Sequence, residues 1–180
     1  MMKKGDPAKT LPKIDPERTF SLKRDGFVGS LYQPERDKYP GKALICFSGS
    51  DGKYELTRKL AAVFQSHGLT TLALAYVMEE GLPDQFYHVP IDMLETAAKR
   101  LHDMGYDKVG LWGISKGAEL ALTAASLLPG IVNAVVAVAP ISTVCQGFSA
   151  IPGRMGTYQA QSGCTAAPLH ESSSCRPAGS

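Results

Sequence analysis

A serine flanked by glycines stands where an apolar stretch gives way to helix-forming residues. The segment from Lys108 to Leu120 reads KVGLWGISKGAEL and places Gly113, Ser115 and Gly117 in a Gly-x-Ser-x-Gly pattern. Glycines at these positions allow a sharp turn between a strand and a helix, and the serine at its apex exposes its hydroxyl. The pattern predicts a nucleophilic serine, which needs a base to take its proton before it attacks a carbonyl.

A second loop of small residues is expected beside this serine. Residues 48–52 read SGSDG and directly follow the apolar stretch KALICF. The ends of parallel strands meet at one edge of a sheet, so this loop and Ser115 should face the same edge. We expect an oxyanion hole built from the backbone N–H of Lys116, without its charge, and an N–H of Gly49 or Ser50, each donor contributing about 3 kcal/mol. Without a nucleophile, both segments would be ordinary tight turns.

Stretches with the period of a strand alternate along the chain with stretches with the period of a helix. A hairpin is predicted within residues 19–34, with its turn at Arg24-Asp25-Gly26. The chain is then expected to form strands at 42–47, 69–77, 108–112 and 131–140, separated by helices at 54–68, 89–105 and 115–128. This order predicts an α/β fold, α/β-hydrolase-like, with a mostly parallel sheet flanked by helices.

Composition and charge narrow the classes of partner. The 180 residues are 44% hydrophobic and 20% charged, which is typical of one globular domain, and the net charge of +2 gives no drive toward nucleic acid or membranes. The start of the chain lacks the apolar core of a secretory leader, and no apolar run reaches the roughly 20 residues of a membrane span, so a cytoplasmic location is expected. Cys46 is expected to be a buried free thiol.

Three segments resemble one enzyme family. Residues 41–76, 82–101 and 108–140 resemble successive parts of the α/β-hydrolase domain of the acyl-CoA thioester hydrolase and bile acid-CoA:amino acid N-acyltransferase family, and the elbow GISKGAEL is the most specific part. The resemblance implies that Ser115 is the nucleophile, that an acyl thioester or ester is the substrate, and that no metal or organic cofactor is needed. It also implies that a triad acid and a histidine should follow the serine.

The end of the chain departs from that family. Residues 141–180 are rich in Ser, Gly and Pro, have no regular apolar period, and contain three of the four cysteines. We therefore divide the chain into a flexible lead-in at 1–18, a partial α/β-hydrolase domain at 19–140 and a low-order tail at 141–180. The strands expected after residue 140 in the family are missing.

Three interpretations of this tail remain open. His170 could be the catalytic base, since it follows Ser115 in the sequence, although Glu171 adjoins it and no strand is predicted to position it. A metal site could form from Cys145, Cys164, His170 and Cys175, although paired ligands at short spacing are absent. We favour a truncated or frame-shifted hydrolase domain, which is expected to be a weak hydrolase or an inactive binding module. The apolar strand at 131–140 would then expose a sheet edge through which the chain could self-associate.

Overall fold

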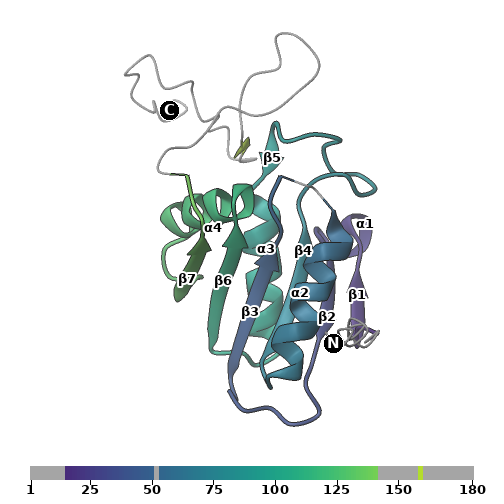
Figure 1. Ribbon diagram of the computed structural model, residues 1–180, viewed down its shortest axis with the longest axis vertical. Helices are drawn as coiled ribbons and strands as arrows, with labels where there is room; N and C mark the ends of the chain where they lie inside the picture. The colour runs from purple at the N-terminus through teal and green to yellow at the C-terminus, as the bar shows by residue number, and fades with distance from the viewer. Residues whose placement is uncertain (1–14, 51–52, 142–157, 160–180) are drawn as a thin grey trace, which may run out of the picture.

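Six strands form one sheet that has helices on both faces (Figure 1). The computed structural model describes residues 15–50, 53–141 and 158–159. Within these residues the strand order is β1-β2-β4-β3-β6-β7. The strands are β1 (Arg18–Phe20), β2 (Val28–Tyr32), β3 (Lys42–Phe47), β4 (Thr70–Ala75), β6 (Lys108–Ile114) and β7 (Ala134–Val138). A separate pair consists of β5 (Val89–Pro90) and β8 (Tyr158–Gln159).

The central strands are parallel, as the alternation of strands and helices predicted. β3 pairs in parallel with β4 and with β6, and β6 pairs in parallel with β7. β2 runs antiparallel to both β1 and β4, so the sheet is mixed at that side. The sheet is therefore mostly parallel and flanked by helices, which confirms the predicted fold class.

The two faces of the sheet are covered by different helices. Helix α2 (Tyr54–Ser66) packs on one face, where Ala61 meets Cys46 of β3 and Ala73 of β4 in a small apolar cluster. The larger core lies on the opposite face, against α3 (Asp92–Asp103) and α4 (Lys116–Leu127). Side chains of successive residues in a strand point to opposite faces, and both faces of these strands are apolar because both are covered.

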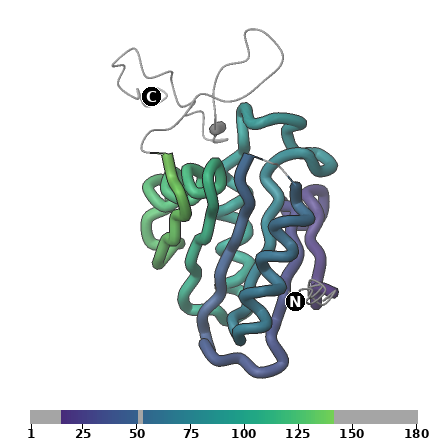
Figure 2. The backbone as a smooth tube through the Cα atoms, in the orientation of Figure 1, coloured from purple at the N-terminus to yellow at the C-terminus, as the bar shows by residue number. Residues whose placement is uncertain are grey.

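The ends of β3 and β6 lie side by side at one edge of the sheet. Their parallel register pairs Phe47, the last residue of β3, with Gly113 near the end of β6. Figure 2 shows the two segments running alongside each other, and α4 begins where β6 ends. The loop after β3 and the turn after β6 therefore open at the same edge, as the sequence predicted.

Three local features differ from the expectations. The segment predicted as a hairpin turn contains a short helix, α1 (Leu22–Asp25), which ends at Gly26 with φ 78°, although the two flanking strands do pair antiparallel. The first residues of the helix expected at 89–105 form β5 instead, because the ring of the proline at 90 disfavours the helical conformation for the residue before it. The last strand is shorter than the stretch 131–140.

The structure describes only part of the outer segments. Residues 1–14 of the predicted lead-in are outside the described residues, and Arg18 already belongs to β1. In the tail only residues 141 and 158–159 are described, and β8 pairs with β5 instead of extending the six-stranded sheet. The three domain boundaries stay a prediction. Among the described residues, no helix has the length and apolarity to cross a membrane.

Candidate active site

Ser115 lies at the turn between β6 and α4 with an unusual backbone conformation. Its φ of 54° and ψ of −117° fall in a region that residues with a side chain rarely adopt. Hydrogen bonds hold the residue there: its N–H donates to Val138 O at 2.9 Å, and its carbonyl accepts the N–H groups of Ala118 and Glu119 at 3.0 and 3.2 Å. The half-buried Ser115 is therefore fixed from both sides in a strained turn.

The two glycines of the pattern allow contacts that no side chain would permit. A Cβ at Gly113 would lie 2.1 Å from Gly117 O, and a Cβ at Gly117 would lie 2.2 Å from Ser48 O. Both contacts are with backbone atoms, which cannot move aside as a flexible side chain can. The glycines thus let β6, α4 and the loop after β3 approach one another around Ser115.

Gly49 lies directly beside Ser115. A Cβ at Gly49 would be 3.1 Å from Ser115 Cβ and 3.7 Å from its Oγ. Gly49 is buried, and the next residue, Ser50, is exposed at the turn. Asp51 and Gly52, which the sequence analysis placed in the same loop, lie outside the described residues. The structure therefore brings the expected oxyanion loop and the expected nucleophile together.

Lys116 opens helix α4, and its side chain is buried in an ion pair. Its Nζ lies 2.8 Å from Glu119 Oε1, one helical turn later, and only 3% and 2% of the two side chains are exposed. The N–H groups in the first turn of a helix point out of its N-terminus, toward the side of Ser115. The backbone of Lys116 lies at this N-terminus, while its ammonium pairs with Glu119, which the sequence did not predict as part of the site.

Tyr76, which directly follows β4, is a second residue that the analysis missed. Its hydroxyl donates to Ser48 O at 2.9 Å and to Gly49 O at 3.0 Å. The side chain is buried, and its ring packs against Phe47 and Phe86 at centroid distances of 6.2 and 5.9 Å. Tyr76 lay within the strand expected at 69–77, and nothing in the sequence distinguished it from its neighbours.

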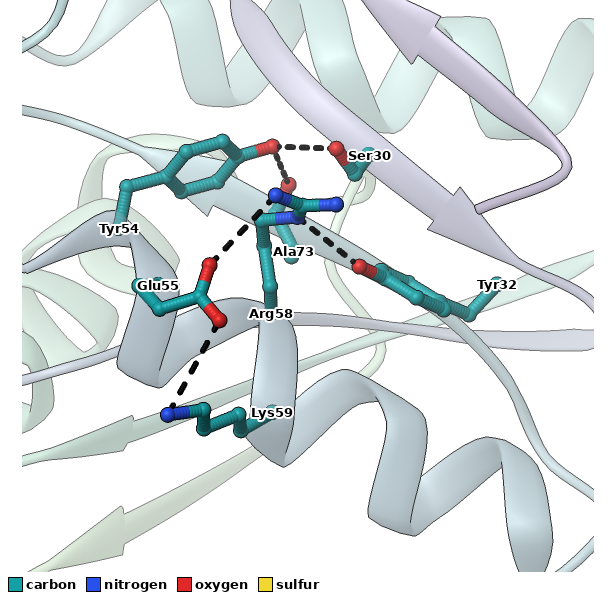
Figure 3. Close-up of polar contacts among 7 residues, drawn as sticks. All are labelled: Ser30, Tyr32, Tyr54, Glu55, Arg58, Lys59 and Ala73. Carbon is teal, nitrogen blue, oxygen red and sulfur yellow. Dashed lines mark hydrogen bonds and ion pairs between the residues drawn. The ribbon is translucent and has the colours of Figure 1, made fainter. Parts of the chain in front are cut away.

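The loop after β3 is also held by contacts with helix α2. Ser48 N–H donates to Thr57 Oγ1 at 3.2 Å. The Tyr54 hydroxyl, at the start of α2, donates to Ser30 Oγ of β2 at 2.8 Å, and Arg58 Nε donates to Tyr32 Oη at 3.1 Å (Figure 3). Burial raises the pKa of Tyr54 further above its ordinary value, at which the phenol is already protonated at neutral pH. These contacts tie α2 to β2 and set where the loop ends.

Sequence comparison relates the chain to thioesterases. It is 35% identical over 143 residues to acyl-coenzyme A thioesterase 1 of Homo sapiens, covering 73% of this chain and 33% of that enzyme. It is 36% identical over 126 residues to the Rattus norvegicus enzyme of the same name, covering 66% and 29%. Acyl-coenzyme A thioesterase 2, mitochondrial, of Homo sapiens is 35% identical over 143 residues, covering 73% and 29%. The chain spans about a third of the length of these curated relatives.

Solved structures identify the fold. A carboxylesterase from Mesorhizobium loti superposes with a TM-score of 0.55 at 18% identity, covering 73% of this chain and 69% of that one. A probable hydrolytic enzyme from Pseudomonas aeruginosa superposes with a TM-score of 0.51 at 20% identity, covering 64% and 37%. The chain has the α/β-hydrolase fold and is related to the acyl-coenzyme A thioesterases. This confirms the resemblance inferred from the elbow segment. No family model matches the chain.

The described histidines form no hydrogen bond with Ser115. His102 lies near the amino ends of β6 and β7, far along the strands from Ser115. Its ring nitrogens lie 2.7 Å from Tyr106 O and 3.1 Å from Ile131 O. His67 follows the end of α2, and His88 precedes β5; both are exposed. His170, the base considered in the sequence analysis, lies outside the described residues, as do Cys145, Cys164 and Cys175 of the alternative metal site.

Proposed function

We propose that this chain is a serine hydrolase that acts on acyl-coenzyme A thioesters or carboxylic esters, with Ser115 as its nucleophile. The observation that carries the proposal is the strained Ser115 at the end of β6, held within contact distance of the Gly49 loop. Strain of this kind persists where the surrounding structure fixes it, and it is frequent at active sites. The thioesterase relatives supply the substrate class.

The proposed reaction proceeds through an acyl-enzyme. A base accepts the Ser115 hydroxyl proton as Oγ bonds to the carbonyl carbon, and the carbonyl π electrons move to its oxygen. When the C=O bond re-forms, the carbon–sulfur or carbon–oxygen bond breaks and the leaving thiolate or alkoxide takes the proton. Water then attacks the acyl carbon in the same manner, releasing the carboxylic acid and restoring Ser115.

The negative charge on the carbonyl oxygen requires hydrogen-bond donors at the turn. The Lys116 N–H, at the start of α4, and an N–H of Gly49 or Ser50, in the loop beside Ser115, are the proposed donors. Such donors stabilise the transition state because they are already oriented before the reaction begins. The Ser115 N–H is not one of the proposed donors to the oxyanion, because it donates to Val138 O.

The proposed reaction also requires a base that accepts the Ser115 proton. In the described ranges, no histidine forms a hydrogen bond with Ser115, so a base would come from outside them, and His170 is the candidate already considered. A chain without a base still has the oxyanion donors, which alone give only residual catalysis. We therefore expect Ser115 to be acylated by an activated ester, with slow turnover.

The experiment is to measure release of p-nitrophenol from p-nitrophenyl acetate, and of coenzyme A from an acyl-coenzyme A, by the full chain. Ser115→Ala should abolish acylation, detected as a mass increase on the peptide that contains residue 115. Turnover of about 1 to 1000 per second, lost in His170→Ala, would identify His170 as the base. Equal rates for the parent and Ser115→Ala would refute the proposal and favour a non-catalytic binding role.

Two further expectations stay proposals. β7 is an outer strand of the described sheet, and its Val136 and Val138 are 50% and 36% exposed, which supports self-association through this edge. At high protein concentration, Val136→Lys should then have a lower sedimentation coefficient than the parent. Equal values for the two proteins would show that the parent does not self-associate through β7. A cytoplasmic location also stays a prediction, because one relative carries the word mitochondrial in its name.

A further inference from the structure

Tyr76 holds two neighbouring carbonyl groups of the loop beside Ser115. Its hydroxyl lies 2.9 Å from Ser48 O and 3.0 Å from Gly49 O, and a single proton is shared between the two acceptors. The side chain is only 3% exposed, so water competes little for these hydrogen bonds. Tyr76 therefore holds two peptide groups from the same side, the one between Ser48 and Gly49 and the one between Gly49 and Ser50.

The orientation of these carbonyl groups also determines where the N–H groups point. A trans peptide group is planar, with its C=O and N–H directed to opposite sides. Within the described residues there is no cis peptide bond. Because Tyr76 holds Ser48 O, the Gly49 N–H points away from Tyr76. Because it holds Gly49 O, the Ser50 N–H does so as well.

The loop needs such an anchor because it contains glycine. The close approach of Ser115 favours a glycine at position 49, because a Cβ there would be 3.1 Å from Ser115 Cβ. Glycine also gives the adjoining peptide groups access to many backbone conformations. Peptide groups that can rotate make poor oxyanion donors, since their dipoles would have to reorient during the reaction.

We propose that the Tyr76 hydroxyl is a positioning group that orients the Gly49 and Ser50 N–H groups toward the carbonyl oxygen of a substrate attacked by Ser115. The inference rests on the proposed function, since an oxyanion is formed only if Ser115 reacts. Tyr76 itself contacts the loop carbonyls on the side away from the donors and does not touch the substrate. Its ring fills the space between Phe47 and Phe86, a separate role that phenylalanine can also fulfil.

Two tyrosine variants separate positioning from stability. Tyr76→Phe removes the hydroxyl and keeps the ring. Tyr106→Phe is the matched control, because its buried hydroxyl accepts a hydrogen bond from Gln33 Nε2 at 2.8 Å and donates one to Thr70 Oγ1 at 3.3 Å, at the opposite edge of the sheet. Loss of a buried hydroxyl destabilises both variants by similar amounts.

The readout is the acylation of Ser115 by p-nitrophenyl acetate under single-turnover conditions, in the full chain. The concentration of reactive Ser115 is first measured from the end point of labelling with a fluorophosphonate, so that unfolded molecules do not count. Tyr76→Phe should lower the maximal acylation rate per reactive site about tenfold and leave the half-saturating ester concentration unchanged. It should weaken inhibition by phenylboronic acid, which forms a tetrahedral adduct with serine, by a similar factor. Tyr106→Phe should change both quantities less than about twofold.

The outcomes distinguish a failure of the positioning role of Tyr76 from a failure of the proposed hydrolase function. Equal acylation rates per site in Tyr76→Phe and the parent, or equal losses in Tyr76→Phe and Tyr106→Phe, would overturn the positioning role and leave Ser115 as nucleophile. A rise in the half-saturating concentration with an unchanged maximal rate would also overturn it. If the parent is not acylated, or if Ser115→Ala is acylated as fast as the parent, the proposed function itself fails, and the role of Tyr76 fails with it.

Discussion

The backbone of Gly117 packs against the carbonyl of Ser48 so closely that a Cβ at position 117 would lie 2.2 Å from Ser48 O. The second glycine of the elbow therefore forms a contact between elements, in addition to permitting the turn. It joins the first turn of α4 to the end of β3, which are 69 positions apart in the sequence.

Replacing this glycine should disrupt the site. In Gly117→Ala, the new Cβ would meet Ser48 O and Phe47 O, both backbone atoms, so α4 and the loop must move apart. We expect a loss of about 3 kcal/mol in the free energy of unfolding, measured by urea denaturation. Gly110→Ala, in the same strand as the elbow, is the control, because its Cβ would meet only the Leu44 side chain at 3.3 Å and Ala134 O at 3.7 Å. Equal losses in the two variants would contradict the prediction.

The strained backbone of Ser115 predicts a trade between stability and activity. Glycine adopts a φ of 54° without the steric cost of a Cβ, so Ser115→Gly should raise the free energy of unfolding by about 1 kcal/mol. Ser115→Ala keeps the Cβ and should unfold close to the parent. Both variants lose the hydroxyl and should not be acylated. Differential scanning calorimetry would detect the difference, and a lower melting temperature for Ser115→Gly than for Ser115→Ala would contradict it.

The buried ion pair below the elbow should be sensitive to the loss of one partner. Glu119→Gln removes the carboxylate charge that lies 2.8 Å from the buried Lys116 ammonium, and we expect a loss of about 3 kcal/mol in stability. The double replacement of Lys116 by Met and Glu119 by Leu removes both charges and should be more stable than Glu119→Gln. Chemical denaturation of the three proteins tests this order. A double replacement that is less stable than Glu119→Gln would contradict the prediction.

The acid dependence of stability should report on Asp25. Burial raises the pKa of its carboxyl, but hydrogen bonds from the Arg24 side chain and the Ser21 N–H, both 2.9 Å long, outweigh this and leave the pKa below its ordinary value. A lowered pKa in the folded state stabilises the protein above the unfolded pKa of about 4, and the effect is lost as pH falls through the folded value. Asp25→Asn should therefore melt at a lower temperature than the parent at pH 7. The gap should close toward pH 3, and a gap that widened in acid would refute this assignment.

Local sequence patterns predicted the strands and helices well, but they did not predict which strands lie next to one another in the sheet. The continuous apolar run around Cys46 predicted a strand buried on both faces, and the thiol is indeed buried and free. Periodicity does not state which strand lies next to which. The contact between Tyr76 and Gly49 exists because β4 neighbours β3 in the sheet, and it has no signature in the 26 residues that separate the two positions.

The same limit explains the remaining differences at the site. The Lys116 and Glu119 pair has the i, i+3 spacing of an exposed helical salt bridge, and only the packing of α4 against the sheet makes it buried. The prediction for Ser115 rested on a motif whose local geometry is fixed by its own glycines. Gly49 and Ser50 were placed beside it because the carboxyl ends of parallel strands lie together, so their placement could be expected as well. Their catalytic roles stay predictions.

The order of strands in the sheet has a consequence for synthesis on the ribosome. β3 is made early, but its neighbour β6 is made only after β4, β5 and α3, so the pair that forms the site joins distant parts of the chain. A nascent chain that ends before residue 108 can pair β2, β4 and β3 yet lacks the strand that carries the serine. Until β6 emerges, the side of β3 that will receive it is an open template for other strands. Binding by chaperones should therefore be strongest after β4 has emerged from the ribosome and before β6 has emerged, and ribosome profiling of chaperone-bound chains would locate that interval.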